Sequence, residues 1–476
     1  ADVSLDTSGF TTSGDGGNGN WKQNGVTGQT PSQSPAQLGN ALLNDGNGNQ
    51  WSLVGKANVF ALGTDTPVIN IPGGFLDLQE ACDFFAGFSH NSEQKITLEI
   101  QAGFEITTPT TFVNVNSSFI EITSVDVEVK VGATFPSTSS VINAVNSRPA
   151  ILNTIIDVDN IVTVSSYNVT SASIATIAIN AGMKNGGDRG LHSQNGSTVY
   201  ADNCVFTGFQ KAGVHASRNS KVQCADADFS GNSQNPANTF GAIYASRGSV
   251  IHGPSMNATN SGAEGVRVQR GATIVCPDVD LTGCTGTAMI ANGGTISTTS
   301  GLPIMLNLKG QALVAVSGGQ AHIGAAVITH ASGVTDPSIE CRNARVIANG
   351  VNISGQDGRG IYAEGVNAMV DIDGGVIAGG TDCLFAFEGG SINAVNSTIT
   401  GASNNGATAT QGGKIIIAES SVTGSGNDDL SINKGSWMSA NSCTTTNGVG
   451  TPDISDTNLT GGFNFADNGN RGFIWS

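Results

Sequence analysis

A repeat of about 23 residues runs through the C-terminal two-thirds of the chain and limits the folds that it can adopt. Short segments with alternating apolar residues begin at positions 360, 383, 406 and 429, each 23 residues after the one before. Earlier units begin at Gly190, Gly213, Ala242, Gly265, Thr287 and Ala312. A period of this size is typical of stacked supersecondary units, in which each unit buries its apolar residues against its neighbours.

The pattern within each unit is that of β-strands. An alternating segment leads to a Gly or Asn bend, and a second apolar segment leads to a closing signature, polar-x-x-apolar-Ser/Thr-Gly, at 226–231, 278–283, 396–401 and 419–424. Alternation between Gly and Asn bends is a strand signal. Leucine-rich repeats need a denser Leu pattern, and helical repeats would not tolerate so many of the 65 Gly residues. We therefore predict an all-β fold, a right-handed single-stranded parallel β-helix with one coil per repeat.

The N-terminal third is organised differently and indicates a cap. Leu78, Ala81, Cys82 and Phe85 follow helical spacing, which predicts a short amphipathic helix over 75–88. Solenoids need such caps because an open terminal coil is an aggregation edge. We predict a head or neck region at 1–70, the capping helix and first coils at 71–135, the β-helix at 136–446 and a C-terminal cap at 447–476.

Charge and cysteine content exclude several classes of function. The net charge of −17 disfavours nucleic acid, because phosphate binding requires a basic face. No run of 18 apolar residues is present, so we expect no membrane insertion. The eight Cys form no CxxC pair and are interpreted as small buried apolar residues. We expect neither a metal nor another cofactor.

The stretches 14–17, 21–36 and 42–51, rich in Gly, Asn and Gln with Trp21 and Trp51 as anchors, together resemble the opening of many bacteriophage tailspike proteins. The capping helix, the strand over 96–103 and the coils are similar too. The resemblance implies a homotrimeric spike on the virion tail, joined to the phage tail or baseplate. It also implies a pectate-lyase-like β-helix that binds, and often cleaves, a host surface polysaccharide. That family has no shared catalytic motif that maps onto this sequence, so its active residues do not transfer.

Stacking of equivalent positions predicts a stripe of cationic and aromatic side chains. The residues two past the start of successive units should face outward, and they are His192, His215, Tyr244, Arg267 and Met289. Those five past the start are Asn195, Arg218, Arg247, Arg270 and Asn292. Arg binds carboxylates bidentately, and Tyr and His offer flat faces for sugar rings, which favours a glycan groove. The alternative is that the Arg row balances nearby acids or packs against a neighbouring subunit.

A second candidate is acidic. Asp226 and Asp228 point the same way on one strand, about 6.6–6.8 Å apart along the chain, and Asp278 and Asp280 repeat the pattern two coils later. Such a pair suits inverting glycoside hydrolysis. The alternative is that these Asp residues only punctuate the coil bends. Two weaker groups are Asp188-Arg189 with His192, and Asp357 with Arg359, Tyr362 and Glu364.

Three classes of function remain open from the sequence. The leading expectation is an enzyme that depolymerises capsule, exopolysaccharide or O-antigen. It would act either as a glycoside hydrolase or as a lyase with a Tyr or His base and an Arg that stabilises developing charge. The second is a non-catalytic receptor-binding spike for the same glycans, and the third is a structural or adhesive solenoid. Flat polar faces on so long a β-helix also predict a homotrimer.

Overall fold

The protein is described by a computed structural model, which divides into two compact units, Ala1–Val205 and Phe206–Ser476. The structure describes residues 10–13, 20–23, 42–44, 50–54, 57–61, 68–73, 75–85, 88–90, 95–235, 237, 240–299, 301–432, 435–446, 449–450, 453–454 and 473–475. Both units are parallel β-solenoids, with about 14 turns in all, so the predicted fold class is confirmed. Much of the predicted head region and the predicted C-terminal cap lie outside the described residues.

The first unit begins with antiparallel strands and continues as parallel coils. Its antiparallel pairs are formed by β1 (Phe10–Ser13) and β2 (Asn20–Gln23), and by β3 (Leu42–Asn44), β4 (Gln50–Val54) and β5 (Ala57–Ala61), with β7 (Phe88–His90) beside β5. The parallel strands of its coils are β6 (Val68–Ile71), β8 (Ile96–Ile100), β11 (Ile120–Ser124) and β14 (Ile151–Leu152); β9 (Glu105–Ile106), β12 (Glu128–Val131), β15 (Ile155–Asp157) and β18 (Gly182–Lys184); β10 (Thr110–Val113), β13 (Ile142–Val145), β16 (Tyr167–Thr170) and β19 (Leu191–Gln194); and β17 (Ile174–Thr176) with β20 (Thr198–Tyr200).

The one helix among the described residues is α1 (Leu78–Phe85), and it lies within the predicted range. Its buried residues are the four that the helical spacing selected, Leu78, Ala81, Cys82 and Phe85. The helix is joined to β10 through Gln79, whose Oε1 accepts from the backbone N of Thr111 at 2.5 Å and whose Nε2 donates to the Thr111 carbonyl at 3.3 Å. The helix therefore lies against a strand of the first coils, as a cap would.

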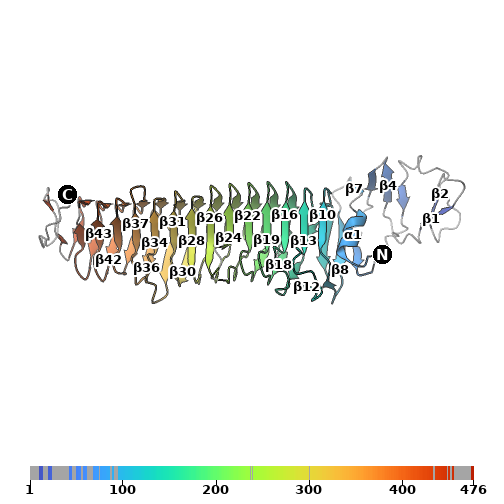
Figure 1. Ribbon diagram of the computed structural model, residues 1–476, viewed down its shortest axis with the longest axis horizontal. Coiled ribbons are helices and arrows are strands. Elements are labelled where there is room, and N and C mark those ends of the chain that lie inside the picture. The colour runs from blue at the N-terminus through green and yellow to red at the C-terminus, as the bar shows by residue number, and fades with distance from the viewer. Residues whose placement is uncertain are drawn as a thin grey trace. The chain divides into compact units, whose positions relative to one another are not determined.

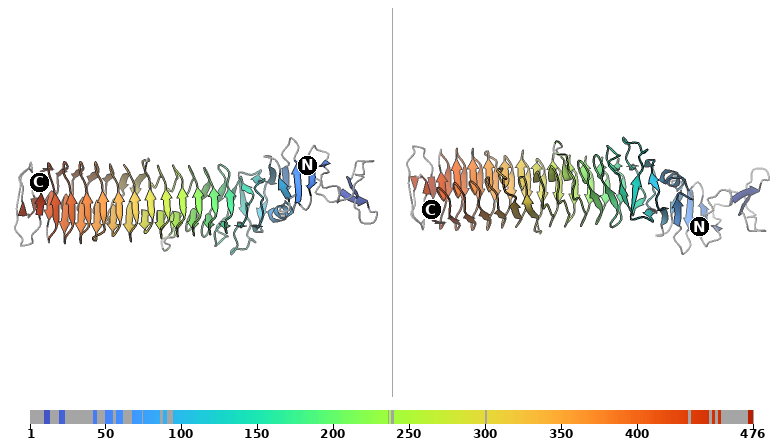
Figure 2. Two further views of the ribbon diagram at one scale, coloured as in Figure 1. Left: turned by 90° about the horizontal axis from the view of Figure 1, so that it is seen from above. Right: turned by 90° about the horizontal axis from the view of Figure 1, so that it is seen from below.

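The second unit has three parallel sheets, which we call sheets I, II and III. Figure 1 shows strands of sheet I from β22 to β43 following one another in chain order, and Figure 2 shows the same regular succession from two opposite sides. Sheet I contains β22 (Val214–Ser217), β24 (Gly241–Ser246), β26 (Glu264–Gln269), β28 (Thr287–Asn292), β31 (Leu313–Val316), β34 (Ile339–Arg342), β37 (Ile361–Glu364), β40 (Leu384–Phe387), β43 (Ala407–Thr410), β46 (Leu430–Ile432) and β49 (Val449–Gly450). β21 (Val205–Thr207) spans the boundary between the units.

Sheet II forms a second side of the coils, and sheet III forms a third side from Ile304 onward. Sheet II contains β23 (Lys221–Gln223), β25 (Val250–His252), β27 (Thr273–Val275), β29 (Thr295–Ser297), β32 (Gln320–His322), β35 (Arg345–Ile347), β38 (Met369–Asp371), β41 (Ser391–Asn393), β44 (Lys414–Ile416), β47 (Trp437–Ser439), β51 (Phe473–Trp475) and β50 (Asp453–Ile454). Sheet III contains β30 (Ile304–Leu308), β33 (Val327–His330), β36 (Asn352–Ser354), β39 (Val376–Ala378), β42 (Thr398–Thr400), β45 (Ser421–Thr423) and β48 (Thr444–Thr445).

The core of the second unit is built from columns of apolar side chains that point inward at the same position of successive coils. One column on sheet I is fully buried and consists of Val214, Ile243, Val266, Met289, Leu313, Ile339, Ile361, Leu384, Ala407 and Leu430. Because side chains alternate along a strand, the residue after each of these faces outward. All eight Cys are unbridged and buried, as the sequence predicted.

Candidate functional site

His215, Tyr244 and Arg267 occupy one outward-facing column of sheet I, as the repeat predicted. The rings of His215 and Tyr244 stack with centroids 4.3 Å apart and planes at 18°. The expectation that these side chains face solvent is wrong, because His215 is only 7% and Tyr244 only 4% exposed. Phe240, from the long connection before β24, packs edge-on against the Tyr244 ring at 5.2 Å and helps to cover both rings.

Met289 does not continue this column, which corrects the sequence-based alignment. It lies opposite Val266 in the buried inward column, and Ile290 is the residue opposite Arg267. Asn292 likewise lies opposite Gln269 rather than at the bend. Since inward apolar positions set the register of a strand, the coil must be counted from Ala288 and not from Thr287.

Arg267 is held inside a polar layer and is not available as a free cation. It forms an ion pair with Glu264, and the two side chains are 12% and 11% exposed. Burial raises the pKa of Glu264, against the opposing effect of Arg267. Gln269 donates to the Tyr244 hydroxyl. The column is therefore a closely packed layer on the outside of the sheet.

Arg218, Arg247 and Arg270 lie at the bend that follows sheet I in three successive coils, and all three are exposed. Each has a left-handed backbone with φ of 55°. Asn219 N donates to the carbonyl of Arg247 at 3.1 Å, and Gly248 N donates to that of Arg270 at 3.2 Å, so the bends stack in register. The predicted Arg row is thus present as a column.

Charge sets this Arg column apart from the bends of the other coils, since Ser317, Glu388 and Gln411 share its left-handed backbone. Like charges on neighbouring strands repel one another. Within the described part of the chain, Arg247 and Arg270 have no side-chain hydrogen bond or ion pair. An anion bound across the column would relieve this repulsion.

His192 belongs to the first unit. It lies on β19 opposite Asn168, and its Nδ1 is 3.3 Å from Ser165 Oγ. The neighbouring Arg189 contacts Asp188 at 2.8 Å, and Asp188 is buried. Arg189 Nη1 also donates to Ser165 Oγ at 3.5 Å, so the weaker group predicted from Asp188, Arg189 and His192 comes together around Ser165.

The predicted acidic residues lie on another side of the coil from the Arg column. Asp228, Asn257 and Asp280 pair in successive coils, so Asp280 lies two coils after Asp228, as the sequence predicted, and Asp280 pairs with Ile304 of sheet III. Asp226 and Asp278 are exposed and take left-handed backbone at φ of 53° and 55°.

These carboxylates have structural partners at the bends. Asp228 Oδ1 accepts from Ser230 N at 2.9 Å and from Asn257 Nδ2 at 3.0 Å. Asp280 Oδ1 accepts from Thr282 N at 2.9 Å. An Asp carboxylate that accepts from the backbone N two residues on is typical of turns, so this geometry favours a structural role at the bends. The catalytic role of the four Asp residues stays a prediction.

A further polar group, on the outward face of sheet I, joins two strands. Glu340 and Arg342 are the outward-facing residues of β34. They lie opposite Tyr362 and Glu364, respectively, on β37. Arg342 Nε is 2.6 Å from Glu340 Oε1 and 2.9 Å from Glu364 Oε2. Gln311 Nε2 donates to Glu340 at 2.6 Å. We call Glu340, Arg342, Tyr362 and Glu364 the Glu–Arg–Tyr–Glu square.

Aromatic rings border this square on β40. Phe385 lies opposite Tyr362, with centroids 5.8 Å apart, and Phe387 lies 6.3 Å from Phe385. Arg359 stacks over Phe385 with its guanidinium 3.8 Å from the ring centroid. Phe385 and Phe387 are half-buried, so part of each ring faces solvent.

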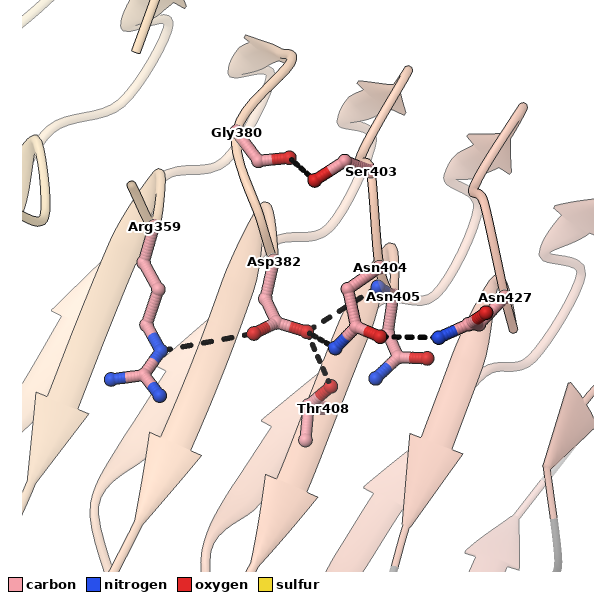
Figure 3. A network of polar contacts seen from close by, with 8 residues as sticks. All are labelled: Arg359, Gly380, Asp382, Ser403, Asn404, Asn405, Thr408 and Asn427. Atoms are coloured by element: carbon pink, nitrogen blue, oxygen red, sulfur yellow. Dashed lines mark hydrogen bonds and ion pairs between the residues drawn. The ribbon is translucent and has the colours of Figure 1, made fainter. Parts of the chain in front are cut away.

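A polar network continues from Arg359 along the edge of sheet I, as Figure 3 shows. Arg359 Nε lies 3.8 Å from Asp382, which is 7% exposed. The other oxygen of Asp382 accepts from Asn404 Nδ2 at 3.0 Å and Thr408 Oγ1 at 3.3 Å. Asn427 in turn donates to Asn404 Oδ1. Asp382 is thus enclosed by donors and fixes the position of Arg359.

Sequence analysis singled out Arg359, Tyr362 and Glu364 but missed Glu340 and Arg342. The repeat pattern assigns no coil start between Ala312 and Gly360, although β34 begins at Ile339. The signal was present, since 339–342 alternates apolar and polar residues in the same order as 361–364. Asp357 does not join the square; its side chain accepts from Gly333 N at 2.6 Å.

Comparison with models of known protein families gave no match, and neither did comparison with curated proteins. Across the described residues, no group of three or more His, Cys, Asp or Glu side chains is arranged to hold a metal ion. The described part of the chain also contains no helix with the length and apolar character needed to cross a membrane.

Proposed function

We propose that this protein is a phage tailspike that binds a host surface polysaccharide along the outward face of sheet I and cleaves it. The observation that carries the proposal is the concentration of aromatic, Arg and carboxylate side chains on that one face. They lie in two groups, on β22 to β26 and on β34 to β40, in coils that are stacked about 4.8 Å apart. An extended glycan running along this face could contact many of them at once.

The chemistry of this face suits sugars. Arg and carboxylate groups form charge-assisted hydrogen bonds with hydroxyl and carboxylate groups. Phe387 offers a partly exposed ring for the apolar face of a pyranose, beside Phe385, whose ring is stacked under Arg359. The exposed Arg247 and Arg270 favour a glycan that carries negative charge.

Between the two possible chemistries, hydrolysis is better supported than β-elimination. A lyase needs a base that is deprotonated near neutral pH. Burial and the neighbouring Glu364 raise the pKa of Tyr362 to about 12, so its phenol keeps its proton. Tyr244 and His215 are covered by Phe240 and by each other. The partly exposed carboxylates remain as the groups that could act on a glycosidic bond.

The assignment as a tailspike is supported by the opening sequence at 14–51 and by the parallel solenoid. It places the protein on the virion tail as a homotrimer, facing the host envelope. The glycan would be capsule, exopolysaccharide or O-antigen.

The test is to incubate the purified protein with a panel of bacterial capsules, exopolysaccharides and O-antigens. We expect one polysaccharide to be shortened, with new reducing ends and no ultraviolet absorption from unsaturated products. Ultraviolet absorption from unsaturated products would show that the reaction is β-elimination and not hydrolysis. Binding without shortening would establish the second candidate, a non-catalytic receptor-binding spike, which the structural partners of the predicted Asp residues favour. Absence of both binding and shortening across the panel would overturn the proposal.

A further inference from the structure

We propose that the first unit carries a separate sugar-binding site, at the bends that follow β10 and β13, which takes a single acidic sugar through its carboxylate. The inference rests on the proposed function, because it names a charged building block of the polysaccharide and a place that would hold it. The residues that carry the inference are Asn114, Asn116, Asn146, Arg148 and Ile174. We call them the Asn–Arg pocket.

The Asn–Arg pocket is a hollow of about 320 Å³. Sites for small ligands typically measure about 300–1,000 Å³, so this hollow suits one sugar residue and not a long segment of polymer. Its polar side chains are exposed, so a ligand can reach them from solvent. Every lining residue lies between positions 114 and 174, and the pocket therefore belongs to the first unit alone.

One wall of the pocket is a column of three different side chains from successive coils. Asn116 and Arg148 pair as partners on parallel segments. Ile174 N donates to the carbonyl of Ser147 at 2.9 Å, which places Ile174 beside Arg148 in the following coil. Because stacked coils lie about 4.8 Å apart, an amide, a guanidinium and an apolar side chain are all within reach of one ring.

The other wall contains Asn114 and Asn146, and hydrogen bonds hold it in place. Asn146 Nδ2 donates to Asn114 Oδ1 at 2.8 Å. Between the two walls, the buried Ser147 Oγ accepts from Val115 N at 3.1 Å and donates to the Val145 carbonyl at 2.8 Å. These bonds fix the bend without a ligand, and such preorganisation lowers the entropic cost of binding.

Arg148 is the group that selects an anion. It is exposed, and among the described residues its guanidinium has no hydrogen bond or ion pair. In contrast, Lys95, Lys184 and Arg189 of the same unit are each paired with a carboxylate. Arg binds a carboxylate through two parallel N–H donors. An unpaired guanidinium beside three amides is therefore a place for a ligand that carries a carboxylate.

The remaining side chains suit the rest of an acidic sugar. Asn116 Oδ1 accepts from Ser118 Oγ at 2.8 Å, so its Nδ2 is the atom that can donate to a ring hydroxyl. Ile174 is 38% exposed and offers an apolar surface to the C–H face of a pyranose. A simple anion would use only the guanidinium, whereas an acidic pyranose would use all three groups. The pocket is therefore assigned to a pyranose that carries a carboxylate.

The experiment measures binding to the full chain by saturation-transfer NMR. The probes are methyl glucuronide and methyl galacturonide, and the comparison ligands are methyl glucoside, acetate and inorganic phosphate. We expect at least one uronide to bind under conditions in which none of the comparison ligands does.

Two variants and a matched control locate the bound uronide. Arg148→Gln should weaken its binding about tenfold or more, because the charge-assisted hydrogen bonds are lost. Asn116→Asp keeps the acceptor for Ser118 but sets a negative charge beside the sugar carboxylate, so it should weaken binding at least as much. Arg345→Gln removes an exposed cation from sheet II and should bind like the wild type.

The outcomes separate this inference from the proposed function. Absence of uronide binding, or unchanged binding in both pocket variants, overturns the Asn–Arg pocket. Equal binding of acetate or phosphate would show a site for any anion and would overturn the assignment to a sugar. The polysaccharide panel tests the proposed function by itself, since shortening of a polymer does not depend on the uronide result. Thermal melting checks folding; if Arg148→Gln fails to fold, Asn116→Asp decides the result.

Discussion

The imidazole of His215 lies against the phenol ring of Tyr244, at a centroid distance of 4.3 Å, although the two residues come from different coils. The contact is possible because the repeat places them opposite one another on β22 and β24. The stack is nearly closed to solvent beneath Phe240. A glycan on this part of sheet I would therefore touch the exposed Arg column before it touched these rings.

This order of exposure leads to a prediction for the Arg column. The double variant Arg247→Ala/Arg270→Ala should bind the polysaccharide about tenfold or more weakly, because each charge-assisted contact is worth about 1.5–3 kcal/mol. The salt dependence of binding should also decrease, since exposed charges are screened. Titration of labelled polysaccharide at two ionic strengths measures both effects.

The control for the Arg column is Arg345→Ala/Lys414→Ala, which removes two exposed cations from sheet II. It changes the net charge equally and should leave binding close to that of the wild type. Equal weakening by both double variants would mean that only overall charge matters. Unchanged affinity in Arg247→Ala/Arg270→Ala would show that the polysaccharide does not bind at the Arg column.

The sequence was sufficient for the fold and for much of the side-chain register. Alternation and the bend spacing placed His215, Tyr244 and Arg267 in one column, because a solenoid repeats the same backbone path in each coil. The prediction that Met289 faces outward is wrong because the step between units is shorter there. A one-residue error in register exchanges the inward and outward faces of a strand.

Burial on the outward face could not be predicted from the repeat. The cover over Tyr244 comes from Phe240, in a connection that interrupts the 23-residue spacing. The sharing of Arg342 between Glu340 and Glu364 likewise depends on side-chain reach between two coils. A periodic pattern gives the column of a residue, whereas its partners are set by the three-dimensional packing.

The acidic pair gives a second prediction. In Asp226→Asn/Asp228→Asn, we expect the fold to be retained, because an amide oxygen can still accept from Ser230 N. Cleavage should also be retained if these carboxylates serve only the bends. In contrast, Asp228→Ala should lower the free energy of unfolding by about 1–3 kcal/mol, since Ser230 N and Asn257 Nδ2 lose their acceptor. Reducing-end assays and chemical denaturation measure the two effects. Loss of cleavage in a folded Asp226→Asn/Asp228→Asn variant would instead support Asp226 and Asp228 as the catalytic pair.

The third prediction concerns assembly. Sheets II and III carry exposed apolar side chains, among them Ile304, Val327, Met369 and Val376. Packing of parallel chains around a threefold axis would remove such surface from water, so we expect a homotrimer. Light scattering at micromolar concentration should give three times the chain mass of 48.2 kDa. A monomer mass under these conditions would contradict the prediction.

The last prediction concerns pH. His330 is 8% exposed, and its Nε2 lies 2.5 Å from Ser338 Oγ. Burial lowers the pKa of His330 below 6.5, so the unfolded chain takes up a proton at a pH where the folded chain does not. The free energy of unfolding should therefore fall as pH decreases from about 6.5 towards the lowered pKa.

His330→Gln should be less stable at neutral pH but should lose this part of the pH dependence. Denaturation midpoints of the wild type, His330→Gln and the exposed control His252→Gln, compared from about pH 7 to 5, measure the difference. Parallel curves for the wild type and His330→Gln would show that His330 does not couple folding to protons.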